Sequence, residues 1–266
     1  FYEKYKSKLT AGEVDKHDVA RYILQCKNGK NLYDKNVTLQ ALEKNETLEN
    51  EFYRNYDLKA MKGRIIPKPL NFKSKQDKKV EDNTLIFVGT EQSIVYSGYS
   101  DDGANTSREL FKVNKLPNGN WGLPVNVGNT VNTPYDEEFA FLHPDGKTLY
   151  FSSKGHNTMG GYDIFRSVYD PESGQWSAPV NLAHPVNSPD DDIFYASDNE
   201  ETFAYFASKN FTKPGKIKVY KISTKGAEQA ATVLPVIIKG SFTMNGELVY
   251  AKTEIKVTDK ATGKQI

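Results

Sequence analysis

The chain has 266 residues, of which 38% are hydrophobic and 12% aromatic, enough to bury a core as one large or two small domains. Its 35 basic and 34 acidic residues give a net charge of +1, which provides no overall electrostatic attraction for nucleic acid or an anionic membrane. The longest apolar runs, such as residues 233–238, are far shorter than the roughly 20 residues that span a bilayer. The single cysteine excludes a disulfide framework and Cys-based metal sites.

Residues 1–34 differ from the rest because their apolar positions follow helical spacing. This spacing predicts an amphipathic helix over residues 14–28 with Gly29 as its stop signal; its apolar positions are Val14, Val19, Tyr22, Ile23 and Cys26. Aromatic residues before Gly12 suggest the end of an earlier helix, and the first residue is not methionine, which suggests that a longer N-terminal part precedes it. We interpret residues 1–34 as a TPR-like remnant of a helical repeat, and Cys26 as a small buried apolar residue.

Residues 35–234 contain a β-rich unit that repeats at a constant interval. The sequence Pro-Leu-Asn or Pro-Val-Asn begins at positions 69, 124 and 179, and the two steps between them are equal. We call this step the repeat interval. Apolar runs with an aromatic residue at the third place recur at the same interval, at residues 94–97, 149–152 and 204–207. Trp121 and Trp176, each after a Gly-containing turn, are also one repeat interval apart. A constant interval indicates that each unit folds into the same sheet.

Each unit has room for four short strands. In the clearest unit we expect strands over residues 138–142, 148–153, 162–168 and 176–182, with turns at 143–146 and 160–161. Four antiparallel strands repeated at a period of this size are typical of β-propeller blades. The predicted fold is therefore mainly β, a propeller with about four legible blades. The alternative is a β-sandwich with accidental internal similarity.

The best unit resembles the TolB-like, WD-like propeller repeat of bacterial envelope proteins. The resemblance is carried by Leu-Tyr-Phe-Ser-Ser-Lys at 149–154 and Gly-Gly-Tyr-Asp-Ile-Phe at 160–165, after Val-Asn-Thr-Pro-Tyr-Asp-Glu at 131–137. It covers residues 67–238, so residues 35–66 would form a degenerate blade. The other units depart from the motif, with Lys218 and Glu109 in the place of Asp163.

Residues 235–266 resemble the start of a carboxypeptidase-regulatory-like β-sandwich. The resemblance rests on Ile-Lys-Gly-Ser-Phe at 238–242 and Asp-Lys-Ala-Thr-Gly-Lys at 259–264. The order of helical repeat, propeller and sandwich is similar to that of OmpA-family envelope proteins of Bacteroidetes, including the PorE type associated with type IX secretion. This resemblance implies a periplasmic, outer-membrane-associated protein that is tethered to peptidoglycan through a domain outside this chain.

A catalytic role finds little support in the residue pattern. The four histidines, His17, His143, His156 and His184, show no metal-ligand spacing, and no nucleophile elbow or phosphate loop is present. The segment 170–176 is similar to the Asp-box turns of sialidases, which are structural. We therefore predict no catalytic residue, no cofactor and no metal site, and keep a propeller enzyme, either a glycoside hydrolase or a peptidase accessory, as the alternative.

Three acidic pairs keep the repeat interval, each just before the first strand of a unit: Glu81 and Asp82, Asp136 and Glu137, and Asp191 and Asp192. In a closed ring they would gather at one face near the axis. They are either solvated loop residues or a negatively charged mouth for a cation or a basic segment of a partner. We carry the six as candidate partner-binding residues of a non-enzymatic scaffold that binds protein partners in the envelope. An enzyme should instead gather carboxylates with shifted pKa in a deep central pocket.

Overall fold

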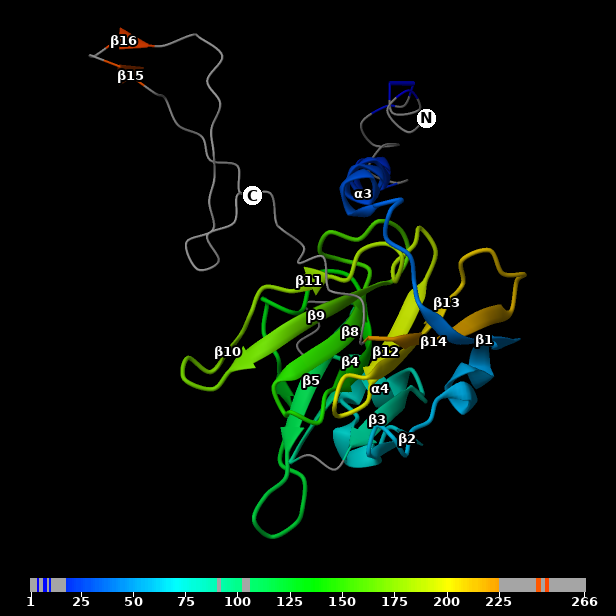
Figure 1. Cartoon of the computed structure of the whole chain (residues 1–266). Coiled ribbons are helices and arrows are strands. Elements are labelled where there is room, and N and C mark those ends of the chain that lie inside the picture. The colour runs from blue at the N-terminus through cyan, green and yellow to red at the C-terminus, as the bar shows by residue number, and fades with distance from the viewer. Residues whose placement is uncertain are drawn as a thin grey trace. The chain divides into compact units, whose positions relative to one another are not determined.

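The computed structural model describes residues 18–89, 92–101 and 106–224, together with residues 4, 7, 8 and 10 and two short strands near the C-terminus. The chain divides into two compact units, residues 1–227 and residues 228–266. Antiparallel β-sheets dominate the compact unit of residues 1–227 (Figure 1). In the second unit, β15 (Thr243–Met244) pairs with β16 (Glu247–Leu248). The rest of the expected sandwich start, residues 235–266, lies outside the described residues.

The helix α3 (Val19–Leu32) precedes the sheets. The predicted helix over 14–28 is present from Val19 onward, while residues 14–17 lie outside the described residues. The helix continues past Gly29, whose carbonyl accepts a hydrogen bond from the backbone N–H of Tyr33. No helix among the described residues combines the length and apolar character needed to span a bilayer.

The predicted apolar face of α3 is buried at Val19 but not at Tyr22 or Cys26. Cys26 is exposed and Tyr22 is 45% exposed, whereas Val19 and Gln25 are buried. The reason is that the helix docks through polar groups: the side-chain amide of Gln25 donates to the Thr158 hydroxyl at 3.2 Å and to the carbonyl of Gly160. Hydropathy spacing does not report contacts of this kind.

The middle unit confirms the predicted strands. It contains β7 (Glu137–Leu142), β8 (Thr148–Ser153), β9 (Asp163–Asp170), β10 (Gln175–Trp176) and β11 (Val180–Asn181). The sheet order is β10-β9-β8-β7, and β11 also pairs with β9. The fourth predicted strand is thus two short pieces, because Pro179 between them has no backbone N–H to donate to the ladder.

The last unit is completed by a strand from the beginning of the chain. Its own strands are β12 (Asp192–Ser197), β13 (Phe203–Ser208) and β14 (Lys216–Ser223), and β1 (Ala41–Leu48) pairs with β14 at the edge. The expectation that residues 35–66 form a degenerate blade is therefore wrong. They supply β1, the 3-10 helix η1 (Glu49–Asn55) and β2 (Gly63–Pro67), and β1 covers an edge that would otherwise leave backbone groups unpaired.

The first repeat unit is less regular than the middle and last repeat units. Its sheet contains β4 (Ser93–Tyr99), β5 (Arg108–Asn114) and β6 (Val125–Asn126), preceded by the short helices η2 (Leu70–Phe72) and α4 (Lys75–Lys79). The strand β3 (Leu85–Gly89) pairs with β2 instead of with β4. The described residues form several antiparallel sheets and no closed ring, so the mainly β prediction is confirmed at that level.

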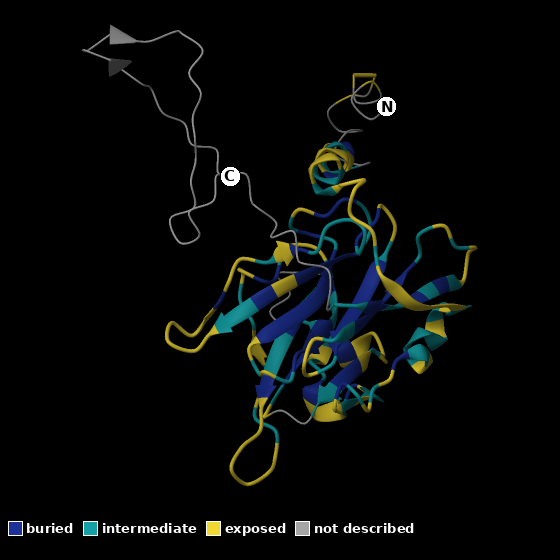
Figure 2. Cartoon of the chain, viewed as in Figure 1, coloured by how far each residue is buried: buried dark blue, intermediate teal, exposed yellow. Residues whose placement is uncertain are grey.

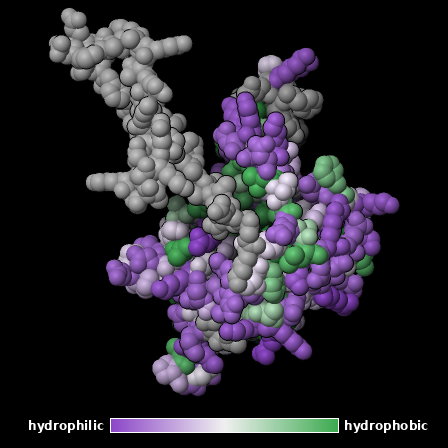
Figure 3. Space-filling view, in the orientation of Figure 1, coloured by the Kyte–Doolittle hydropathy of each residue, from purple (hydrophilic) through white to green (hydrophobic). Residues whose placement is uncertain are grey.

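The core of residues 1–227 lies in the strands at their centre (Figure 2). The aromatic residues at the third place of the repeated apolar runs, Tyr96, Phe151 and Phe206, are all buried, as expected for residues that pack neighbouring sheets. One core cluster joins side chains of all three units with Tyr56 and Met61. By contrast, the face visible in Figure 3 is mostly hydrophilic, with small hydrophobic patches.

Candidate functional site

The second residue of each acidic pair is buried. Asp82 is 5% exposed, and Glu137 and Asp192 have no exposed surface. Glu137 accepts hydrogen bonds from the Thr133 N–H at 2.8 Å and from the Ser153 hydroxyl at 2.6 Å. Asp192 accepts one from the Ser188 N–H at 2.5 Å. Because Thr133 and Ser188 are equivalent positions, Glu137 and Asp192 fix the same loop in two successive units.

The first residue of two pairs forms a salt bridge with a lysine. Asp136 lies 2.9 Å from Lys154 Nζ, and Asp191 lies 3.1 Å from Lys209 Nζ. Both lysines directly follow the second strand of their unit and are themselves one repeat interval apart. Glu81 is exposed, in a left-handed backbone conformation with φ of 53°.

These contacts correct the expectation that all six acids are surface residues. Asp82, Glu137 and Asp192 are closed off from any partner and hold the framework together, because a buried carboxylate needs hydrogen bonds to replace its hydration. The three remaining members, Glu81, Asp136 and Asp191, keep some exposed surface. Binding of a basic partner by these three stays a prediction.

Two buried asparagines, which the sequence reasoning did not single out, fasten neighbouring units together. Asn187 accepts from the Ile164 N–H at 2.8 Å and donates to the Ile164 carbonyl at 2.8 Å. Asn132 makes the same two contacts with Leu110, at 2.8 and 3.1 Å. The two asparagines are one repeat interval apart, in Val-Asn-Thr-Pro and Val-Asn-Ser-Pro, and this recurrence is the signal that could have found them.

The position of Asp163 shows why the repeat motif varies. Strand register places Glu109, Asp163 and Lys218 in equivalent positions, opposite Gly98, Ser153 and Ser208. Asp163 accepts hydrogen bonds from the Met159 N–H at 3.0 Å and the Asn181 side chain at 2.7 Å. Lys218 instead donates to the carbonyls of Asn210 and Phe211. Both residues anchor the loop that precedes their strand. Asp163 accepts from a backbone N–H of that loop, and Lys218 donates to backbone carbonyls of the equivalent loop.

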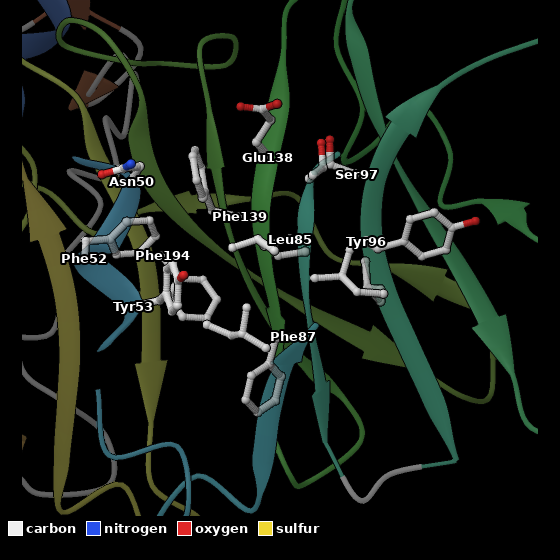
Figure 4. Close-up of a pocket in the computed structure, with 15 residues that line it drawn as sticks. Asn50, Phe52, Tyr53, Leu85, Phe87, Tyr96, Ser97, Glu138, Phe139 and Phe194 are labelled. Carbon is white, nitrogen blue, oxygen red and sulfur yellow. The ribbon is translucent and has the colours of Figure 1, made fainter. Parts of the chain in front are cut away.

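A cavity of about 310 Å³ lies where β3, β4, β7 and β12 approach η1. Aromatic and aliphatic side chains make up most of its lining, and Figure 4 shows the rings of Phe52, Phe139 and Phe194 gathered on one side. Among the described residues that line it, Glu138 is the only one with a charged side chain. Its volume is within the range of small-ligand sites.

A chain of ion pairs, buried at Lys68 and partly buried at Arg108 and Glu138, ends at this cavity. Lys68 Nζ contacts Asp77 at 3.0 Å and also pairs with Asp82. Arg108 then joins Asp82 at 2.8 Å to Glu138 at 2.7 Å, and its third nitrogen donates to the Thr84 hydroxyl at 2.7 Å. Arg108 thus ties the segment before β3 to β7 across the gap between two units.

The two carboxylates that Arg108 joins differ in their acidity. Burial would raise the pKa of Asp82, but hydrogen bonds from Arg108, Lys68 and Thr84 outweigh it and lower that pKa. At Glu138 burial is the larger effect, and it raises the pKa although Arg108 and the Tyr162 hydroxyl, which donates at 2.8 Å, act against it. Glu138 is therefore the carboxylate of this network that can respond to a bound ligand.

The histidines have structural surroundings where they are described. His143 lies in the predicted turn, where Nδ1 accepts from the Asp145 N–H at 3.1 Å, and His156 contacts the Val131 carbonyl at 2.8 Å. Within the described residues, no group of three or more His, Cys, Asp or Glu side chains is placed to hold a metal ion. His17 lies outside them.

Comparison with known proteins gave no relative from which a role could be transferred. No family model matches the chain, and neither a curated protein nor a solved structure does. The geometry of the site is therefore the basis for the function proposed below.

Proposed function

We propose that this chain is a non-enzymatic scaffold of propeller type that binds a protein partner. The observation that carries the proposal is the aromatic cavity at the junction of the units, since rigid apolar pockets with few polar groups are where partners anchor side chains. The surrounding framework suits this role. Its repeated carboxylates and asparagines are bound to the chain itself, which fixes the cavity walls in place.

The propeller architecture is supported by two features. Three successive units carry equivalent strands and equivalent polar contacts. In addition, β1 joins the start of the repeat region to its last sheet, which protects the edge strand that an open array would expose. The arrangement that we propose is a propeller-type array of three blade-like sheets, with η1 and β2 between the last and first repeat units.

The cellular setting is proposed from the sequence resemblance alone. On that basis the protein acts in the periplasm, associates with the outer membrane and is tethered to peptidoglycan through a domain outside this chain. A role in type IX secretion is part of the same proposal.

The proposal is tested by affinity capture with the full-length protein from an envelope extract of the source bacterium. Each captured protein is then purified, and its binding is measured by calorimetry. We expect saturable binding of one envelope protein to residues 35–227. If no captured protein binds again when pure, the scaffold proposal is wrong.

The enzymatic alternative has one observation in its favour, the raised pKa of the Glu138 carboxyl at an apolar cavity, which is an environment used by general acids. Glycoside hydrolysis requires a second carboxyl group about 5 to 10 Å away, and Glu138 is the only acid among the described lining residues. We expect no turnover of glycosides or peptides by the pure protein. Turnover that disappears in Glu138→Gln would establish the alternative.

A further inference from the structure

We propose that the cavity binds an apolar ring that carries a positively charged group beside it. This inference rests on the proposed binding function of the same site and names the chemistry of its ligand. The ring would fill the aromatic part of the cavity, and the cation would lie against Glu138.

The apolar half of the inference follows from the lining. Phe52 and Tyr53 of η1 lie with Phe139 and Phe194 around the cavity, and Leu85 lines it as well (Figure 4). An aromatic group placed there would contact ring edges and faces on several sides, an arrangement that stabilises aromatic clusters in protein interiors. The volume of about 310 Å³ can hold one such ring.

The charged half follows from the ion-pair chain. Lys68 and Arg108 supply two positive charges, whereas Asp77, Asp82 and Glu138 supply three negative ones. The neighbouring pair of Asp136 and Lys154 is neutral. One negative charge is therefore in excess, and Glu138 is where the chain meets the cavity.

The segment that borders the cavity shows the same imbalance. Lys209 lies between Glu49 of η1, at 2.9 Å, and Asp191, at 3.1 Å, so one cation again faces two carboxylates. Arg54 and Glu51 of η1 form a neutral pair. Arg108 cannot attract an anion, because its three nitrogens already contact Thr84, Asp82 and Glu138. The cavity mouth is therefore complementary to a cation.

The inference is tested with matched probes of opposite charge. Phenethylamine and hydrocinnamate carry the same ring on similar stems, and their binding is measured by NMR titration at low salt. A second pair of capped peptides, one with Phe-Lys and one with Phe-Glu, shows whether a partner chain can supply the same chemistry. We expect the cationic member of each pair to bind on the order of tenfold more tightly, and the preference to shrink as salt is added.

Two variants assign the binding to this cavity. Glu138→Gln keeps the shape of the side chain and should bring the two members of each pair within about twofold of each other. Ala140→Leu, which fills part of the lining, should weaken all probes alike, with the melting temperature measured to show that the variant is folded. Equal binding of amine and acid to the wild-type protein would overturn the inference. So would probe binding that Ala140→Leu leaves unchanged, even where the protein still binds a captured envelope partner.

Discussion

Most of the polar side chains that recur at the repeat interval form hydrogen bonds within the protein that hold its strands and loops together. Asn132 and Asn187 pair with the backbone of the preceding unit as a further strand would, because a side-chain amide offers one donor and one acceptor in the geometry of a peptide group. A polar residue that recurs in each repeat therefore indicates a buried backbone group that needs a hydrogen-bond partner in each repeat. Its recurrence alone does not indicate a ligand.

Replacing Asn187 by alanine should lower the free energy of unfolding by about 2 kcal/mol, because it leaves the buried N–H of Ile164 without a partner, whereas the Ile164 carbonyl keeps its hydrogen bond from the Leu182 N–H. Asn118→Ala is the matched control, since Asn118 bonds only within an exposed turn and should cost about 0.5 kcal/mol or less. Urea unfolding of both variants measures the difference. Equal losses would show that the buried amide does not fasten the units.

Asp163 should make stability depend on pH above the usual acidic range. Burial raises its pKa to about 7, so the folded protein keeps the proton after the unfolded chain, with a pKa near 3.8, has released it. The stability contributed by this proton is fully present below the unfolded value and is lost as pH rises through about 7. Asp163→Asn should therefore flatten the decline between about pH 4 and pH 7 by up to about 1.4 kcal/mol per pH unit. Unfolding curves with the same slope against pH in both proteins would contradict this.

Removing the Arg108 charge is expected to be costly. Arg108→Ala leaves Asp82 and Glu138 without their shared cation, and the loss of one member of a buried pair costs about 3 to 5 kcal/mol. Arg54→Ala removes an arginine from an exposed pair with Glu51 and should cost less than about 1 kcal/mol. Chemical denaturation of the two variants compares them, and a small loss at Arg108 would refute its bridging role.

The acidic pairs mark the limit of prediction at this scale. Their register was visible in the sequence, and it correctly marked equivalent positions at the start of β7 and β12. Their burial was not visible, because many of the lysines, hydroxyl groups and backbone N–H groups around each pair come from other loops and units. The cavity escaped prediction for the same reason, since Phe52, Phe139 and Phe194 belong to separate segments.

At the scale of elements, strands with a buried face were predictable and edge strands were not. The residues of β8 are all buried, and the predicted bounds, 148–153, are those of the strand. In β1, by contrast, nearly every residue is exposed, so no alternation of polar and apolar residues marks it. The strand exists because β14 offers it an unpaired edge.

Breaking β1 should therefore weaken the last sheet. The double variant Lys44→Pro with Asn45→Pro removes two adjacent backbone N–H groups, at least one of which must face β14, because they alternate along a strand. Hydrogen exchange of the β14 amides should become faster, whereas Lys44→Ala with Asn45→Ala, which keeps both N–H groups, should leave it close to the wild-type rate. Unchanged protection in the proline variant would contradict the pairing.

The helix α3 was predicted from apolar spacing, but only Val19 of its predicted apolar positions 19, 22 and 26 is buried. Apolar spacing located it, yet the contacts of Gln25, Asn28 and Arg21 with backbone or side-chain oxygens of residues 154–160 decide which face is buried. Polar docking leaves Tyr22 and Leu24 largely exposed.

Across the whole of residues 1–227, the repeated sheets are held together by a shared core and by polar contacts between neighbouring repeat units. The repeat interval predicted equivalent sheets in succession, and the middle and last units agree with that. It could not predict that β3 leaves its own unit to pair with β2, because the competition between two partners is settled by tertiary packing. The result places η1 over the junction, where the cavity lies.

The most direct test of the partner-binding account is site-specific photo-crosslinking in living cells of the source organism. A benzophenone amino acid replaces Tyr53, which lines the cavity, or Phe211, which is 90% exposed in the loop between β13 and β14. The account predicts one discrete crosslinked partner from position 53 and none from position 211. Crosslinks of equal yield from both positions, or from position 211 alone, would contradict it.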